Sequence, residues 1–276
     1  MPLWLYALPN WLFGVLIISA WVTLGVGGHA LCHRFVRKPF HDTEKEVAIA
    51  LLAVVATINS LLLAFSAVSV WEAFVNAQKA VSAESDTIGE LASDLAVFNT
   101  DASHQARDQL KDYIHAVIEH EWPAMRKGED DLPTWDAFDN LFRAVGKLRP
   151  GTPSETVLMP EIWARTNELI KFRRSRLAAS HGEVPGTLWV VVLIGTMLTV
   201  MPTFVLPRTR FNRGAIGVLS VSMGLVFFFV GAMDRPFLGE ESIGTLAFES
   251  SLNSIARWDA ADIASTVLER VTGRPH

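Results

Sequence analysis

Charged residues are missing from four long stretches of this 276-residue chain. The stretches without Asp, Glu, Lys or Arg are residues 11–31, 47–71, 184–207 and 214–233. Because an α-helix rises about 1.5 Å per residue, roughly 20 apolar residues cross the hydrocarbon core of a bilayer. A helix in a soluble core of this length would carry charges on its solvent-facing side. The absence of charge therefore argues against an ordinary soluble protein and predicts four transmembrane helices.

Cysteine is also nearly absent, since Cys32 is the only one. A single cysteine excludes an intramolecular disulfide. No Lys or Arg precedes Arg34, and bulky Leu31 stands where a lipoprotein cleavage site needs a small residue. We therefore expect the first apolar stretch to be retained as a helix, with Asn10 as its N-terminal cap.

Recognisable catalytic and metal-binding motifs are missing as well. The chain has no glycine-rich phosphate loop, no GxSxG nucleophile motif and no HExxH or cysteine-rich zinc spacing. His29 and His33 share a helix face, but such a pair near a membrane interface is more often solvated than metal-bound. The sequence thus predicts neither an enzyme nor a bound metal or cofactor.

Four crossings organise the chain into membrane and extramembrane parts. The first two spans lie within residues 10–71, and the last two lie within residues 184–233. Between them, residues 72–183 are predicted to form a helical extramembrane domain, and residues 234–276 a helical tail. The inserted domain carries 19 acidic and 13 basic residues, which makes nucleic acid an unattractive partner. The predicted fold is an all-α integral membrane protein.

Within the inserted domain we expect the second span to continue as an amphipathic helix to Phe98, because no proline interrupts it. Asp101 or Ser103 is predicted to cap the next helix, which should end near Pro123. A third helix is expected from Thr134 to residue 149.

The last helix of the inserted domain is expected after the break at residues 150–153, with Ser154 as its cap. Its basic C-terminal end, between Lys171 and Arg176, suits the negative pole of the helix dipole.

The second span is the only one with polar residues along its whole length. At 3.6 residues per turn, Thr57, Leu61, Phe65 and Ser69 lie on one face. This face could line a pore in which the bulky pair forms a hydrophobic constriction. The alternative is packing between helices, with the hydroxyl groups bonded back to their own helix.

Several segments resemble the bestrophin-like domain family of bacterial membrane proteins, over about residues 45–256. The segments that carry the resemblance are Leu61-Leu-Leu-Ala-Phe65, Trp71-Glu72, residues 83–89, Leu188-Trp189 and residues 233–239. The most specific is the motif after the fourth span, which comprises Asp234, Arg235, Pro236, Phe237 and Gly239. For the Asp234–Arg235 pair, the sequence favours a structural clamp between the fourth span and the inserted domain over an ion site, with the basic residues 171–176 as possible partners.

The resemblance implies a homo-oligomeric ion channel, most often a pentamer, whose second transmembrane helix lines a hydrophobic neck. Leu63-Ala64-Phe65 would correspond to a Leu-Gly-Phe stretch of the bestrophin neck. The neck positions then fall on Thr57, Leu61 and Phe65, where Thr57 replaces an apolar residue. The chain lacks a recognisable acidic calcium clasp, so calcium gating is not implied.

The resemblance also implies the setting of the channel: inorganic ions and membrane lipid as partners, and location in a bacterial inner membrane. Basic residues beside the membrane number seven on one side and six on the other, which leaves the orientation undecided. The resemblance places both termini and the inserted domain in the cytoplasm. It implies anion conduction most often, although bacterial relatives can prefer cations. The acidic excess of the inserted domain, if that domain lines the vestibule, would also favour cations. The alternative function is a membrane-anchored scaffold or sensor whose helical domain binds a partner.

Overall fold

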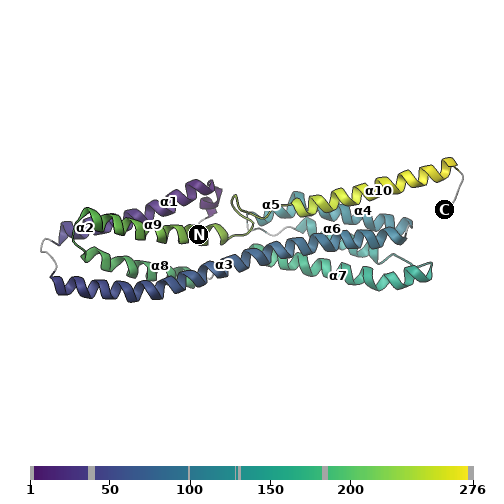
Figure 1. Cartoon of the computed structure of the whole chain (residues 1–276). Helices are drawn as coiled ribbons and strands as arrows, with labels where there is room; N and C mark the ends of the chain where they lie inside the picture. The colour runs from purple at the N-terminus through teal and green to yellow at the C-terminus, as the bar shows by residue number, and fades with distance from the viewer. Residues whose placement is uncertain are drawn as a thin grey trace. The chain divides into compact units, whose positions relative to one another are not determined.

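The computed structural model describes residues 3–36, 41–98, 100–127, 129, 132–181 and 186–272 (Figure 1). Apart from turns and connections the structure is helical, and no β-strand occurs in these described ranges, which confirms the all-α prediction. Residues 37–40 of the first predicted connection, the predicted domain boundary at residues 183 and 184, and the tail end 273–276 lie outside the described residues.

The chain divides into two compact units. The first consists of Met1–Val75 and Gly182–Ser242, and the second of Asn76–His181 and Ile243–His276. The first, which we call the membrane unit, contains the apolar stretches. The second, which we call the extramembrane unit, joins the predicted inserted domain to the C-terminal helix.

The membrane unit is built from helices long and apolar enough to cross a bilayer, and the described residues contain four such candidates, as predicted. A short 3₁₀ turn, η1 (Leu3–Ala7), precedes the first of them. The helical elements are α1 (Asn10–Val22), the π-helical η2 (Thr23–Gly27), α2 (Gly28–Phe35), α3 (Asp42–Phe98), α8 (Gly186–Val200), the 3₁₀ segment η4 (Met201–Val205) and α9 (Arg210–Met233).

Close packing of α1 and η2 against α9 forms the core of the membrane unit. Phe13, Ile17 and Trp21 of α1 bury themselves against Phe227 of α9. Gly224 permits this approach, because a Cβ added there would lie 2.8 Å from Ile18 Cα. Small residues at helix crossings are the usual means by which membrane helices gain van der Waals contact.

The extramembrane unit is a bundle around the second half of α3. Its other elements are α4 (Asp101–Ala116), the π-helical η3 (Val117–Glu121), α5 (Trp122–Met125), α6 (Leu132–Val145), α7 (Pro153–His181) and α10 (Leu246–Thr272). Helix α3 runs without a break to Phe98, as its sequence predicts. Its apolar side, including Ile88, Leu91 and Leu95, is completely buried.

Two predicted helix caps are wrong: Asn10 for α1 and Ser154 for α7. Asn10 is the first residue of α1, after Pro9, and its backbone N–H donates instead to Glu240 Oε2 at 3.0 Å. Helix α7 begins at Pro153 rather than after Ser154. Thr152 acts as its cap, because its hydroxyl accepts a bond of 3.2 Å from the backbone N–H of Glu155.

The predicted boundaries of α4 to α6 also need correction. Thr100, rather than Asp101, caps α4 and forms a capping box with Ser103. The helical path continues through Pro123 to Met125, because proline is tolerated in the first turn of the short helix α5. Helix α6 begins at Leu132, two residues before the predicted start at Thr134.

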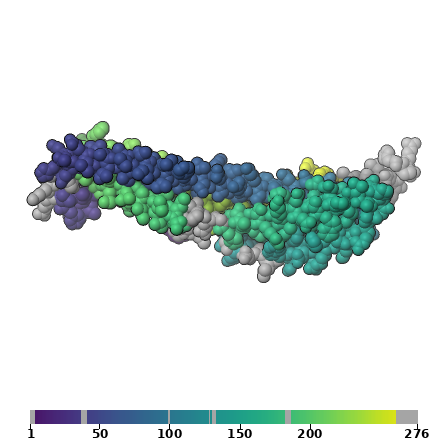
Figure 2. Space-filling view, turned by 90° about the horizontal axis from the view of Figure 1, so that it is seen from below, coloured from purple at the N-terminus to yellow at the C-terminus, as the bar shows by residue number. Residues whose placement is uncertain are grey.

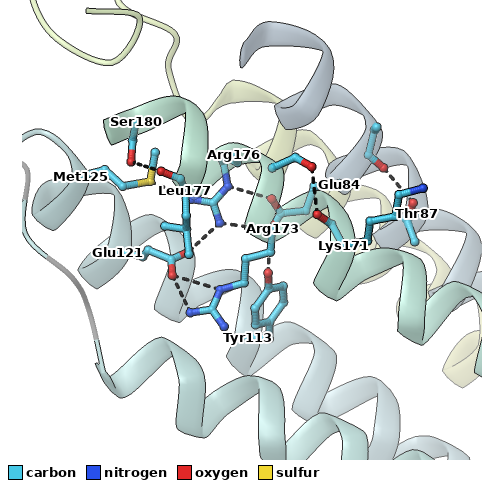
Figure 3. Close-up of polar contacts among 12 residues, drawn as sticks. Glu84, Thr87, Tyr113, Glu121, Met125, Lys171, Arg173, Arg176, Leu177 and Ser180 are labelled. Carbon is cyan, nitrogen blue, oxygen red and sulfur yellow. Dashed lines mark hydrogen bonds and ion pairs between the residues drawn. The ribbon is translucent and has the colours of Figure 1, made fainter. Parts of the chain in front are cut away.

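A fully buried ion-pair network lies inside the extramembrane unit (Figure 3). Arg176 donates to both oxygens of Glu84, at 2.7 and 3.1 Å, and to Glu121 Oε2 at 2.5 Å. Arg173 donates to Glu121 Oε1 from Nε at 3.0 Å and from Nη2 at 2.5 Å. Two guanidinium groups thus balance two carboxylates, and Glu121 joins the pairs.

Aromatic and sulfur contacts complete the surroundings of these charges. The Arg173 guanidinium carbon lies 4.1 Å from the centre of the Trp135 ring, which is a cation–π contact. Arg176 donates to Met125 Sδ at 2.8 Å and lies over the Trp122 ring at 5.2 Å. The network therefore couples α3, η3, α5 and α7 through directional contacts.

Removing the shared charge of this network tests how much it stabilises the unit. Glu121→Gln keeps the shape but leaves two buried guanidinium groups with a single carboxylate. Breaking a buried pair costs about 3–5 kcal/mol, so urea unfolding of the purified protein should show a loss of that size. The matched control is Asp139→Asn, because Asp139 contacts Arg143 at 4.0 Å on the surface. There we expect a loss of under about 1 kcal/mol. Equal small losses for both variants would contradict a stabilising network.

Tyr113 extends the network and makes the stability of the unit depend on pH. Its hydroxyl donates to Glu84 Oε1 at 2.6 Å. Burial raises the pKa of Tyr113 well above its usual value of 10.0, and the neighbouring Glu84 carboxylate raises it further. The folded state holds the phenol proton more tightly than the unfolded state. This stabilisation is therefore complete below pH 10.0 and is lost as the pH rises from there towards the folded pKa.

We expect Tyr113→Phe to remove this part of the alkaline loss of stability. The measurement is the urea midpoint of the helical signal as a function of pH above and below 10. The variant should show a flatter decline than the wild type, whereas Tyr6→Phe, at the only other tyrosine, should keep the wild-type decline of the extramembrane unit. Parallel curves for wild type and Tyr113→Phe would refute the assignment.

Candidate functional site

The predicted pore face lies on the uncovered side of α3. Thr57, Leu61, Phe65 and Ser69 are all exposed in the single chain, with Leu61 57% and Phe65 63% accessible. Figure 2 shows this part of α3 in dark blue, with a broad surface open to view. Two large apolar side chains that project from a membrane helix in this way must be covered by lipid, by another subunit, or face a pore.

The hydroxyl groups near Thr57 are satisfied within the helix. Thr57 Oγ1 donates to the Ala53 carbonyl at 2.7 Å, and Ser60 Oγ donates to the Thr57 carbonyl at 2.8 Å. These back-bonds agree with the packing alternative drawn from the sequence as far as the hydroxyls are concerned. They also leave oxygen lone pairs available on the exposed surface of α3.

The opposite side of α3 fixes the rotation of the helix in the membrane unit. Asn59, Leu63, Ser66 and Val70 are buried there at helical spacing. Asn59 Nδ2 donates to Thr196 Oγ1 of α8 at 3.2 Å. Gly195 leaves the necessary space, because a Cβ at that position would lie 2.4 Å from Asn59 Oδ1. With this side bound to α8, Leu61 and Phe65 must point away from the rest of their own chain.

The motif after the fourth span forms a tight turn within the membrane unit. Asp234 is 5% exposed and accepts a hydrogen bond of 3.3 Å from the Tyr6 hydroxyl of η1. Phe237 is buried, and the Leu238 N–H donates to the Arg235 carbonyl at 3.1 Å. Gly239 has φ +84°, a conformation that disfavours other residues. These contacts give the motif a structural role within the membrane unit, and the predicted clamp between the fourth span and the inserted domain stays a prediction.

The basic residues considered as partners of that motif have other contacts. Arg173 and Arg176 pair with Glu84 and Glu121 inside the extramembrane unit, as described above. The sequence places both at a basic helix end that suits the negative pole of the dipole, but α7 continues to His181 and both side chains are fully buried. One sequence signal could have pointed to this arrangement: a charged residue, Glu84, stands on the otherwise apolar side of α3.

The two histidines of the first span contact one backbone atom. His29 Nε2 and His33 Nε2 lie 3.0 and 2.8 Å from the Leu206 carbonyl oxygen, and their rings are 4.7 Å apart. Leu206 directly follows η4 and precedes Pro207. The pair thus holds the end of the third span against the first, and no cluster of three metal-binding side chains occurs in the described residues.

A groove that the sequence did not suggest lies in the extramembrane unit between α3 and α10. Its volume is about 660 Å³. Six serines line it, together with one carboxylate from Asp86 and another from Glu90. At one wall Ser85 Oγ donates to the Ala247 carbonyl at 2.8 Å. The α3 wall includes Ser82, Asp86, Gly89 and Ser93, and the α10 wall includes Ser250 and Ser254.

Comparisons with known proteins agree with this architecture. The chain is similar to a crystallised membrane protein at 12% identity, with a TM-score of 0.64 over 88% of this chain and 96% of the other. It is also similar to two point variants of a bacterial bestrophin homologue from Klebsiella pneumoniae. Each is 12% identical, with TM-scores of 0.61 and 0.62 over 90% and 89% of this chain and 95% and 96% of theirs. No curated protein matches the chain.

The family assignment comes from the sequence itself. The model of the bestrophin-like domain matches residues 19–248. This range covers most of the chain, including all four apolar helices in whole or in part and the bundle that follows α3. The similar structures share the fold across nearly their full length. The chain therefore belongs to the bestrophin-like domain family.

Proposed function

We propose that this protein is a homo-oligomeric ion channel in which α3 surrounds the central axis and forms a hydrophobic neck. Membership of the bestrophin-like family supports a bestrophin-type channel. The observation that carries the neck is the exposure of Leu61 and Phe65 on a helix whose opposite side is fixed by Asn59 and Leu63. The proposal assigns the chain no enzymatic activity.

The sparse cover of α3 favours assembly with further copies. Within its most apolar window only 17% of the residues are buried, compared with 39% in α9. A helix that its own subunit covers so little gains most from neighbours, and closed rings of identical subunits are the common solution. The family resemblance suggests five subunits, with the extramembrane unit in the cytoplasm of a bacterial cell and the spans in the inner membrane.

The polar residues of α3 favour a watery axis over lipid on this face. Thr57, Ser60 and Ser69 are exposed on or beside the side that carries Leu61 and Phe65. Hydroxyl groups gain more from water than from hydrocarbon, whereas α1 and α9 expose aliphatic side chains such as Val15, Val218 and Leu225 that suit lipid. Leu61 and Phe65 would then narrow the pore and control conduction by excluding water.

Shortening the two neck side chains tests this proposal. Leu61→Ala and Phe65→Ala, alone and together, remove bulk from the proposed constriction and should raise the open conductance severalfold in planar bilayers. The physical reason is that a wider and less apolar neck wets more easily. Leu225→Ala on α9 is the matched control, since Leu225 is 51% exposed on a lipid-facing helix, and it should leave the conductance unchanged.

The absence of any current from the wild type and every variant would contradict the proposed channel, provided that the helical signal shows the protein to be folded. Equal conductance of the wild type and the Leu61→Ala, Phe65→Ala double variant would keep the channel but remove α3 from its narrowest part. The resemblance by itself suggests anions as the permeant ions. The charged residues of α3 beyond the neck affect whether the pore favours anions or cations.

A further inference from the structure

The pore face of α3 has a counterpart further along the same helix. Residues 25 positions apart are separated by about seven turns and so have almost the same angular position. The neck residues Thr57, Leu61 and Phe65 therefore project in the same direction along α3 as three residues of the extramembrane unit. These counterparts are Ser82, Asp86 and Glu90.

Burial along α3 supports this correspondence. In the membrane unit the buried side of the helix includes Asn59, Leu63, Ser66 and Val70. The residues 25 positions later are Glu84, Ile88, Leu91 and Leu95, and all four are buried as well. On the other side Thr57, Leu61 and Phe65 are exposed, and so are Ser82, Asp86 and Glu90. In each unit taken by itself these three positions are exposed, and in the extramembrane unit they border the groove beside α10, with Glu90 also paired with Arg165 of α7.

The exposed side of α3 beyond the neck is acidic. Glu72 and Lys79 lie first along it and cancel each other in charge. Glu90 and Asp94 follow further on, and both contact Arg165, whose Nε donates to Asp94 Oδ2 at 2.7 Å. One guanidinium group therefore compensates two carboxylates. The face retains a negative charge even before Asp86 is counted.

Asp86 is the uncompensated carboxylate of this face. It is exposed, and among the described residues no side chain or backbone group forms a hydrogen bond or ion pair with it. It lines the groove between α3 and α10 together with Ser82, Ser93 and Ser250. At Gly89, no atom lies within 4 Å of where a Cβ would stand, so this wall is open.

We propose that Asp86 is a charge-selectivity residue that favours cations on the ion path beyond the neck. This inference rests on the proposed channel, because only assembly around α3 brings one Asp86 from each subunit to the same level of the axis. Rings of carboxylates attract cations and repel anions. The neighbouring hydroxyls give a permeating cation oxygen ligands while water remains in the groove.

The charge acts through water, and this sets how its effect depends on salt. The Debye length is about 8 Å at physiological ionic strength and about 3 Å at 1 M. A carboxylate beside a water-filled path therefore influences ions strongly in dilute salt and weakly in concentrated salt. The cation preference should decline as KCl is raised on both sides of the membrane.

Reversal potentials in asymmetric KCl test the inference on the intact, reconstituted protein. The wild type should reverse near the potassium equilibrium potential. Asp86→Asn should move the reversal potential towards zero, and Asp86→Lys should move it further, towards the chloride equilibrium potential. Asp112→Asn is the matched control, because Asp112 is an exposed carboxylate on α4, away from the α3 face, and it should reverse as the wild type does.

A second readout tests whether position 86 lies on the path. Asp86→Cys in a Cys32→Ser background carries a single thiol. A cationic thiol reagent should shift its reversal potential towards chloride and an anionic reagent should shift it towards potassium, with the Cys32→Ser parent unaffected.

The outcomes separate this inference from the channel itself. Currents with the same reversal potential in the wild type, Asp86→Asn and Asp86→Lys would overturn the role of Asp86 and leave the channel standing. A wild type that selects chloride would overturn it too. No current from any folded variant would overturn both the channel and the selectivity residue that depends on it.

Discussion

Helix α3 packs through one stripe of residues that recurs every three or four positions, and both compact units depend on that stripe. In the membrane unit it carries Asn59 and Leu63, which meet α8 and the core of the spans. In the extramembrane unit it carries Ile88 and Glu84, which meet the bundle and the ion-pair network. A helix with one inward stripe has one outward face. In each unit the residues opposite this stripe are the exposed ones: Leu61 and Phe65 in the membrane unit, and Asp86 in the extramembrane unit.

The two units bury this stripe by different means. The membrane unit relies on close van der Waals packing, with glycines such as Gly195 and Gly224 at points where a Cβ would collide. The extramembrane unit relies on directional charge contacts as well. Buried ion pairs lose hydration, so their stabilising value depends on complete pairing, and Glu121 supplies this by serving both Arg173 and Arg176. Such pairing fixes the rotation of α3 more narrowly than aliphatic contacts do.

Much of this fold follows from the sequence. The parts that do not follow from it can be explained in physical terms. Uncharged stretches predict the spans, and an unbroken amphipathic pattern predicts α3 to Phe98. For the cap of α4 the sequence favours Asp101 or Ser103, one position or more too late, because Thr100 has equal capping ability and only the backbone path decides. The sequence does not reveal the burial of Arg173 and Arg176, since a basic helix end usually faces water. Helical periodicity predicts which residues share the Leu61 and Phe65 face but does not reveal what that face meets.

The proposed channel requires α3 to surround a central axis with Leu61 and Phe65 towards it. Images of the intact particle in lipid nanodiscs test this most directly, because they give the number of subunits, the axis and the helix nearest to it together. The account predicts a closed ring in which α3 is the innermost helix of every subunit and Leu61, Phe65 and Asp86 face the axis. A monomer, a dimer without a central axis, or a ring lined by another helix would contradict it.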